Sequence, residues 1–401
     1  MNDYDVVVVG ARVAGASTAM LLARAGLRVA LLDRSGYGTD TVSTHALMRA
    51  GVLQLSRWGL LDQVVATGTP PVRRVAFHYA GAETVHVSLR PSPGVDALYA
   101  PRRHLLDRFL VDAAAEAGVE VLHRTTVTGL LRDEHGRVAG VTTAGPPFTV
   151  RARFTVGADG VRSLVARETG APVVHQGTAA GAALYRYLSG LPDDGYVWSY
   201  GPAAAAGLIP TNDGQTCVFV ATTPERMRGL RARSAEAAFR ALLNVAAPEH
   251  AAQVADAEPA GPFHGWGGVP GYVRRSWGPG WALVGDAGYF KDPITTHGIT
   301  DALRDAELLA DALVEVLAGV TPGAVALARY QATRDRLSRD LRDATEAVAA
   351  YDWNTVRVQA LLRRVSSAMS DELEHLEALP GRLVRPAIGG FVGPDTVRAR
   401  T

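Results

Sequence analysis

The sequence has 401 residues, of which 47% are hydrophobic and 20% charged, so it can build a large buried core and is unlike a disordered chain. Its length exceeds one ordinary domain and indicates two lobes or one large α/β unit. Lysine and arginine total 41 against 40 acidic residues, for a net charge of +1. A near-neutral chain has no field of one sign to draw it to nucleic acid or to an anionic membrane.

Cysteine content and the N-terminus restrict the class of protein further. Cys217 is the only cysteine, which excludes an internal disulfide and a thiolate metal cluster, and no His/Cys spacing typical of a metal site occurs. The first residues carry no basic leader or apolar signal core, and no apolar run approaches the roughly 18 residues of a membrane span. We therefore expect a cytoplasmic protein that binds no metal.

The first 33 residues predict a compact βαβ unit. Residues 5–9 (DVVVV) form a continuous apolar, β-branched run, which is typical of a strand buried on both faces of a parallel sheet. A glycine turn at residues 10–15 leads into an alanine-rich helix that stops near Gly26, and a second strand covers residues 28–33.

The rest of the chain alternates between segments of two kinds. Short alternating stretches in residues 72–89, and a β-rich region from about 177 to 262, indicate antiparallel strands. The remaining predicted elements, in chain order, are a helix at 104–117, strands at 119–122, 153–156, 185–188, 196–200, 216–222 and 281–284, a helix from about residue 298, and helical sequence over about the last 70 residues. Because the two kinds of segment interleave, we expect a second sheet inserted into the N-terminal lobe.

The glycine turn is a candidate dinucleotide site. In Gly10-Ala11-Arg12-Val13-Ala14-Gly15 the N-terminus of the following helix offers free N–H groups and a positive dipole end to a pyrophosphate. Asp33 closes the second strand about 20 residues on, where a carboxylate accepts hydrogen bonds from a ribose. Arg12 replaces the usual middle glycine and would add positive charge beside the phosphates. A tight turn that only packs a helix on a sheet is the alternative.

Two further motifs place an aspartate in a glycine turn at a strand end. They are GADGVRSLVAR at residues 157–167 and GDAGYFKDPITTHGI at residues 285–299. Each alone fits an ordinary Asp-Gly turn, but the three motifs in this order are specific. Together they resemble the signature of the FAD-dependent aromatic hydroxylases, the family typified by para-hydroxybenzoate hydroxylase, over about the first 330 residues.

The resemblance implies an α/β fold with a glutathione-reductase-type FAD-binding Rossmann lobe, an inserted antiparallel β-sheet substrate lobe and a helical C-terminus. The implied boundaries are 1–71, 99–176 and 263–330 for the FAD-binding lobe, 72–98 and 177–262 for the substrate lobe, and 331–401 for the C-terminal helices. It also implies one non-covalent FAD, with these residues at the cofactor: Gly10, Arg12, Val13, Ala14, Gly15, Asp33, Arg34, His45, Arg49, Arg103, Val127, Asp159, Gly160, Gly285, Asp286, Pro293, Gly298 and Ile299.

Some roles within this set also follow from the resemblance. Asp286 would bind the ribityl chain or pyrophosphate, and Asp159 with Gly160 would lie near the pyrophosphate and the nicotinamide cofactor. Arg49 belongs to an Arg-Ala-Gly-Val-Leu stretch that indicates a flavin contact, and Arg103 is similar to an arginine that reaches the ribityl and phosphate region.

The helix after Pro293 adds a physical argument. Its first N–H groups, near Gly298 and Ile299, would face the flavin pyrimidine edge, where a helix N-terminus stabilises an anionic reduced flavin by roughly 0.3–1 kcal/mol. Three departures from the family pattern affect flavin placement. They are Tyr289 for a histidine, Thr295 for a glycine and Thr300 for an asparagine.

In this family NADPH or NADH reduces the flavin transiently, O₂ adds to form a flavin hydroperoxide, and its distal oxygen passes to the substrate. The cofactor supplies the chemistry, so no catalytic triad is expected. His45, Tyr185, Tyr289 and His297 are candidate acid–base residues, and a structural role is the alternative for each. Tyr185, Tyr187, Trp198 and Tyr200 lie at alternate positions of predicted strands and are candidate substrate contacts or packing aromatics.

The leading hypothesis is therefore an NAD(P)H- and O₂-dependent hydroxylase or epoxidase of an aromatic or polyketide-like small molecule in specialised metabolism. A flavin-dependent reductase of an isolated double bond, similar to geranylgeranyl reductases, fits the same motifs. A halogenase is disfavoured because no lysine precedes Lys291 and no Trp-x-Trp-x-Ile-Pro stretch occurs. A non-enzymatic flavin-binding protein is the last alternative. The partners are a substrate and O₂, with a separate flavin reductase and a monomer or homodimer left open.

Overall fold

The computed structural model describes residues 3–145 and 148–380. A mostly parallel sheet forms the first lobe, with strand order β17-β18-β8-β1-β2-β5. Its strands are β1 (Tyr4–Val9), β2 (Val29–Leu32), β5 (Glu120–Leu122), β8 (Thr149–Gly157), β17 (Trp277–Gly278) and β18 (Trp281–Leu283). The central strand β1 pairs in parallel with β2 and β8 and is buried from Val6 to Val9, as the valine run predicts.

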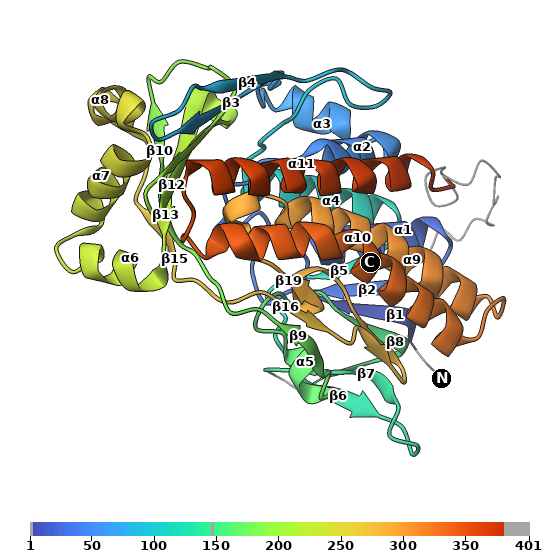
Figure 1. Ribbon diagram of the computed structural model, residues 1–401. Coiled ribbons are helices and arrows are strands. Elements are labelled where there is room, and N and C mark those ends of the chain that lie inside the picture. The colour runs from blue at the N-terminus through green and yellow to red at the C-terminus, as the bar shows by residue number, and fades with distance from the viewer. Residues whose placement is uncertain (1–2, 146–147, 381–401) are drawn as a thin grey trace, which may run out of the picture.

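Three helices cover one face of this sheet, and a small β-meander covers the other (Figure 1). The helices are α1 (Val13–Arg24), α4 (Arg103–Glu116) and α9 (Gly298–Leu317), and they share one apolar core with β1 and β2. On the opposite face lie β6 (Val127–Arg132), β7 (Val138–Thr143) and α5 (Leu164–Glu168). Both faces of the parallel strands are therefore buried.

The second lobe is a mostly antiparallel sheet with strand order β14-β10-β13-β12-β11-β3-β4, and β15 also pairs with β10. Its strands are β3 (Arg74–Tyr79), β4 (Val85–Ser88), β10 (Ala182–Ser189), β11 (Tyr196–Gly201), β12 (Ala204–Pro210), β13 (Gln215–Thr222), β14 (Glu258–Pro259) and β15 (His264–Trp266). Strands of the two large sheets alternate along the chain. The predicted fold, a Rossmann-type lobe with an inserted antiparallel sheet and C-terminal helices, is confirmed.

One face of the second sheet differs from the prediction made for residues 177–262. Three helices, α6 (Pro224–Arg231), α7 (Ala235–Ala246) and α8 (Pro248–Asp256), lie in that region and pack on the outer face (Figure 1). Serine and threonine start two of them, since Thr223 and Ser234 cap α6 and α7 through their side chains. The prediction of β-strands is therefore confirmed from Ala182 to Thr222, within β10 to β13, and wrong from Pro224 to Asp256, where the three helices lie.

The other face of the second sheet carries large aromatic side chains and faces the C-terminal helices. The long helices α10 (Gly323–Ala349) and α11 (Thr355–Glu377) lie beside α9, and the turn between them joins the aromatic core. Shorter elements complete the fold: α2 (Arg49–Arg57), α3 (Leu61–Ala66), and a small sheet of β9 (Val173–Gln176), β16 (Tyr272–Arg274) and β19 (Tyr289–Phe290). The predicted helical region 331–401 is helical to residue 377, and residues 381–401 lie outside the described residues.

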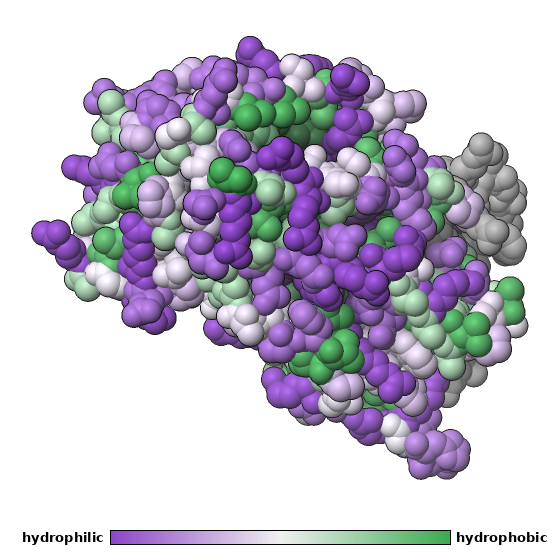
Figure 2. Space-filling view, viewed as in Figure 1, coloured by the Kyte–Doolittle hydropathy of each residue, from purple (hydrophilic) through white to green (hydrophobic). Residues whose placement is uncertain are grey.

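Among the described residues, no helix is both long and apolar enough to cross a membrane. Figure 2 shows hydrophobic residues in small groups among hydrophilic ones over the face in view.

Candidate flavin site

A cavity of about 700 Å³ runs between the two lobes, from the turn after β1 to the second sheet. Its walls include the glycine turn, the start of α4, the turn after β8, the loop between β18 and α9, and strands β10 and β13. The carboxyl ends of β1 and β8 therefore open into it, which is where parallel α/β sheets bind ligands.

Two glycines allow a tight turn after β1, and this turn directs the N-terminus of α1 toward the cavity. Gly10 has φ +103°, and a Cβ there would lie 2.5 Å from the carbonyl oxygen of Ala158. A Cβ on Gly15 would lie 1.8 Å from the carbonyl oxygen of Gly10. The N-cap residue of α1 is Arg12, whose side chain makes no capping hydrogen bond. The first N–H groups of α1 are therefore free for a phosphate, and the turn fits a dinucleotide.

Asp33 lies at the end of β2, on the edge of the same cavity. Its carboxylate accepts hydrogen bonds from the backbone N–H groups of Ala11 and Ser35, both at 2.6 Å. These bonds tie the strand end to the glycine turn. They leave the carboxylate at the cavity edge, where a ribose would meet it.

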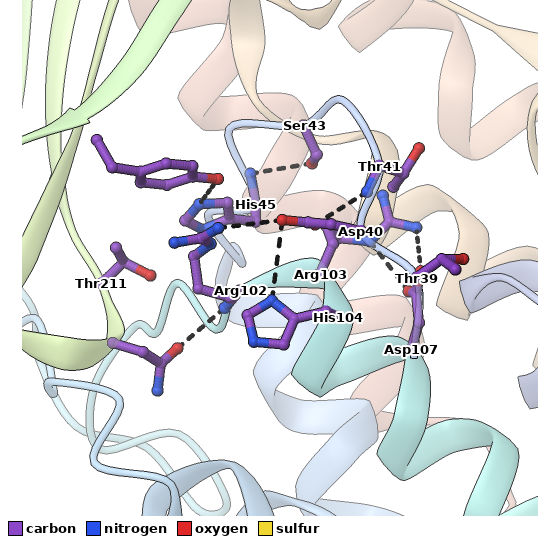
Figure 3. Close-up of polar contacts among 12 residues, drawn as sticks. Thr39, Asp40, Thr41, Ser43, His45, Arg102, Arg103, His104, Asp107 and Thr211 are labelled. Atoms are coloured by element: carbon purple, nitrogen blue, oxygen red, sulfur yellow. Dashed lines mark hydrogen bonds and ion pairs between the residues drawn. The ribbon is translucent and has the colours of Figure 1, made fainter. Parts of the chain in front are cut away.

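Two of the arginines at the cavity, Arg12 and Arg103, are held by one buried carboxylate. Asp107 on α4 accepts from Nη1 of Arg12 at 2.8 Å and from Nε of Arg103 at 3.0 Å. Arg12 also donates to the carbonyl of Thr39, at 2.5 Å. Figure 3 shows Arg103 and Asp107 on α4 with the segment from Thr39 to His45 above them. The side chain of Arg12 is thus directed to α4 and residue 39, so its charge is shared with Asp107.

The Asp159 carboxylate serves first as a helix cap. It accepts hydrogen bonds from the N–H groups of Leu164 and Val165, at 2.7 and 3.1 Å, and from the Ser163 hydroxyl, at 2.5 Å. This arrangement positions α5. Asp159 and Gly160 also line the cavity, as the motif predicts.

Asp286 projects from the loop after β18 into the cavity. The carboxylate is open to the cavity but enclosed by dense protein, and this burial raises its pKa to about 6, although the Lys291 charge opposes the shift. A carboxylate in this state gains from a hydroxyl that donates a hydrogen bond to it. The ribityl chain of FAD offers such hydroxyls.

The start of α9 presents a second set of free N–H groups. His297 is its N-cap residue and makes no side-chain capping bond, and Thr296 before it has φ +53°. Pro293, Gly298 and Ile299 all line the cavity. A helix N-terminus at this place suits the anionic edge of a reduced flavin, and that contact stays a prediction.

A buried network of charged side chains lies behind this helix start. Lys291, the only lysine of the chain, forms an ion pair with Asp301. Arg304 donates to Asp301 at 3.0 Å and to Glu372 on α11 at 2.7 Å. His297 Nε2 lies 2.5 Å from the other oxygen of Glu372. The network therefore attaches α11 to the loop that lines the flavin site.

Charges in this network shift each other's pKa values. Burial lowers the pKa of Lys291 to about 7, helped by the nearby charge of Arg304. Burial alone would raise the pKa of Glu372, but the charges of His297 and Arg304 outweigh it and lower the pKa to about 2. Asp301 and Glu372, the two acidic members of the cluster His297–Asp301–Glu372, are paired with Lys291 and Arg304 respectively.

His45 is part of the cavity wall but has both ring nitrogens engaged. Nδ1 lies 3.1 Å from the Ala100 carbonyl and Nε2 lies 3.1 Å from the Tyr187 hydroxyl. Burial lowers the pKa of His45 to about 3, and the charge of Arg102 adds to the effect. The imidazole is therefore neutral, with Nδ1–H donating to the carbonyl and Nε2 accepting from the phenol. This arrangement favours a structural role.

Most of the predicted cofactor residues line the cavity. Those that do are Gly10, Arg12, Val13, Ala14, Asp33, Arg34, His45, Arg103, Val127, Asp159, Gly160, Asp286, Pro293, Gly298 and Ile299. Gly15 and Gly285 lie behind the wall, where they allow close packing. Arg49 is a correction, because its guanidinium donates to the Arg90 carbonyl and the Ser92 hydroxyl, at 3.1 and 2.9 Å, and is not on the cavity.

Only some of the predicted substrate and acid–base residues line the cavity. Tyr185 and Tyr289 line the cavity, whereas Tyr187, Trp198 and Tyr200 do not and instead pack in the aromatic core. Their alternate spacing along the strands predicted that these side chains share a face of the sheet, but it did not show which of them reach the cavity. The side chain of His297 is fully buried and engages Glu372. Cavity residues that the sequence reasoning missed include Phe219, Asp292, Asp301 and Tyr351. Of these four residues, only Asp292 lies within one of the three motifs.

Comparison with known proteins agrees with this geometry. The family model described as the FAD binding domain matches residues 3–345. The chain belongs to the FAD-binding domain family. It also fits the FAD-dependent aromatic hydroxylases within that family, and it is an FAD-binding oxidoreductase.

Curated relatives of this FAD-binding protein include enzymes of two kinds. The chain is 28% identical to the digeranylgeranylglycerophospholipid reductase of Methanocella arvoryzae, over 90% of this chain and 91% of the relative. It is also 28% identical to the ubiquinone hydroxylase UbiL of Rhodospirillum rubrum, over 98% and 92%. Among solved structures, the probable FAD-dependent monooxygenase pqsL of Pseudomonas aeruginosa superposes with a TM-score of 0.75 and 24% identity, over 92% of this chain and 99% of that chain.

Proposed function

We propose that this chain is a monooxygenase that holds FAD non-covalently and uses NADPH or NADH and O₂ to hydroxylate or epoxidise an aromatic or polyketide-like small molecule. The observation that carries the proposal is the aromatic and apolar lining of the cavity at the second sheet. Phe219, Tyr185 and Tyr351 form its aromatic wall, and the small residues Ala183 and Ala221 leave room between them. This composition suits a compact planar substrate.

FAD, when bound, supplies the hydride acceptor and the oxygen activation that no side chain provides. The free N–H groups of α1 would hold its pyrophosphate and those of α9 its pyrimidine edge, while Asp286 accepts a hydrogen bond from its ribityl chain. The apolar wall around Phe219 would exclude water from the oxygen-transfer step. His45 is neutral and would hold its loop in place without exchanging a proton.

A reductase of an isolated double bond is the second candidate, because digeranylgeranylglycerophospholipid reductases recur among the curated relatives. The lining of the cavity favours the first candidate, because the aromatic side chains of Tyr185 and Phe219 suit a planar ring.

Further proposals concern partners and setting. We propose that the nicotinamide cofactor binds only transiently, that the enzyme acts in the cytoplasm as a monomer or homodimer, and that neither nucleic acid nor a membrane is a partner. Reduction by a separate flavin reductase is the alternative to direct reduction.

Anaerobic reduction followed by air tests the proposal. The purified protein should be yellow, and NADPH should bleach its flavin faster when one compound of a neutral aromatic panel is present. Admitting air should then give an oxygenated product of that compound. A colourless protein that FAD does not reconstitute would contradict the cofactor assignment. A yellow protein that hydrogenates an isoprenoid double bond, without oxygenating any compound, would favour the reductase.

A further inference from the structure

Tyr351 reaches the cavity from an unexpected part of the chain. It lies in the turn between α10 and α11, yet its side chain lines the cavity beside residues of the second sheet. Its backbone has φ +55°, in the left-handed region that bulky residues rarely adopt. Such backbone strain clusters at ligand-binding positions and persists only where the surroundings enforce it.

Aromatic neighbours hold the Tyr351 ring in this position. The Trp353 ring lies 4.8 Å from it, and Trp353 in turn meets Tyr200 of β11 edge to face at 6.2 Å. Tyr351 and Trp353 belong to the same apolar core as Phe219 and Ile294. The turn is therefore docked on the second sheet, which fixes the phenol next to the aromatic and apolar lining of the cavity.

The Tyr351 hydroxyl is buried without a hydrogen-bond partner among the described residues, although the residue is only 4% exposed. Buried hydroxyl groups in proteins nearly always have a partner, because leaving one unpaired is costly. The hydroxyl packs closely against Gly181, where a Cβ would lie 2.9 Å from the Tyr351 oxygen. Gly181 also lines the cavity.

The surroundings define what the hydroxyl would bind. Asp292 lies beside the same glycine, and its two oxygens already accept the N–H groups of Gly181 and Ile294, at 2.6 and 3.0 Å. Phe219 and Ile294, which belong to the same core as Tyr351 and line the cavity, carry no charge. Lys291, the nearest cation along the same loop, is paired with Asp301. A carboxylate on the ligand would meet Asp292 without a counter-charge, so the site favours a neutral group.

We propose that the Tyr351 hydroxyl is the polar anchor of the substrate subsite and hydrogen-bonds an oxygen atom (phenol, ether or carbonyl) of a neutral, planar substrate. The proposal deepens the monooxygenase assignment and rests on it for the location of the substrate. It does not depend on oxygen transfer, because binding precedes any reaction.

Binding of matched probes to the oxidised FAD-loaded protein tests the anchor without NADPH. The probes are 2-naphthol, 2-methoxynaphthalene and naphthalene, followed by the change in visible flavin absorbance. Tyr351→Phe should raise the Kd of the two oxygenated probes about 5- to 10-fold, as expected for one lost hydrogen bond, and should change the Kd of naphthalene less than twofold. Tyr196→Phe is the matched control, because Tyr196 is equally buried in the same core but lies outside the cavity wall.

Gly181→Ala provides a second variant should Tyr351→Phe fail to fold. Its added methyl group would crowd the same hydroxyl and should weaken the oxygenated probes selectively. An equal loss for all three probes would overturn the proposal, and so would a changed FAD affinity in the absence of probe, which would assign the hydroxyl to the flavin. Failure of the wild-type protein to bind either oxygenated probe would overturn the substrate class. Failure of the monooxygenase proposal would appear separately, as normal probe binding without an oxygenated product.

Discussion

Replacing Glu372 by alanine should lower the free energy of unfolding, because it removes a carboxylate from the buried charge network. Glu372 is 1% exposed, and its two oxygens contact Arg304 at 2.7 Å and His297 at 2.5 Å. Removing one partner from a buried ion pair costs about 3–5 kcal/mol, because the other charge stays buried. Arg304 would retain Asp301 and Asp305, so we expect Glu372→Ala to lose about 3 kcal/mol of unfolding free energy.

Urea unfolding of the FAD-loaded protein, followed by circular dichroism, measures this loss. Glu374→Ala is the matched control, because Glu374 lies exposed on the same helix and its removal should change stability by no more than about 0.5 kcal/mol. Glu372→Gln should fall between the two, since it keeps an acceptor oxygen. A loss below about 1 kcal/mol for Glu372→Ala would refute the reasoning that the network fastens α11.

The lowered pKa of Glu372 also predicts how the stability difference between wild type and Glu372→Ala depends on pH. A carboxyl group with a pKa of about 2 in the fold and 4.5 in the unfolded chain adds stability that is fully present above about pH 4.5. That contribution is lost as the pH falls toward 2. The stability difference between wild type and Glu372→Ala should therefore shrink as the pH falls below 4.5.

Two other changes test the flavin cradle. Gly15→Ala would put a Cβ 1.8 Å from the Gly10 carbonyl oxygen. The purified variant should therefore contain far less FAD per chain than wild type, as measured by flavin absorbance. Gly229→Ala is the control and should keep full flavin content, because a Cβ at Gly229 would have open space around it. Asp286 has a pKa raised from 3.8 to about 6, so the stability of the wild-type apoprotein should fall as the pH rises through this window. Asp286→Asn cannot ionise and should remove that fall in thermal unfolding between pH 4 and 7, while binding FAD more weakly; parallel curves for the two apoproteins would contradict the assignment.

Local signals account for the parts of the fold that the sequence predicted. The valine run of β1, the glycine turn and the start of α9 depend on neighbouring residues, and each lies where the motifs indicate. The motif order also implied the inserted sheet. The helices over the outer face of the second sheet were not predicted, although α7 buries residues at helical spacing and Thr223 and Ser234 cap α6 and α7.

Long-range contacts account for what the sequence did not predict. Arg49 sits in a motif typical of flavin contacts, but its side chain finds acceptors at Arg90 and Ser92. Tyr351 is far from every motif and enters the cavity only because α10 turns back into α11. One charge network likewise includes Lys291, Arg304 and Glu372, which lie up to 81 positions apart in the sequence. A single sequence does not show which distant residues form such contacts.

Isotope labelling tests the central claim of oxygen transfer most directly. FAD-loaded protein would be mixed with NADPH, ¹⁸O₂ and 2-naphthol or another neutral aromatic compound that accelerates flavin bleaching, and the products analysed by mass spectrometry. A monooxygenase should place one ¹⁸O atom in the product and none when only the water is labelled. Reduced flavin that returns to the oxidised state in air with hydrogen peroxide alone, for every compound that accelerates its reduction, would contradict the account.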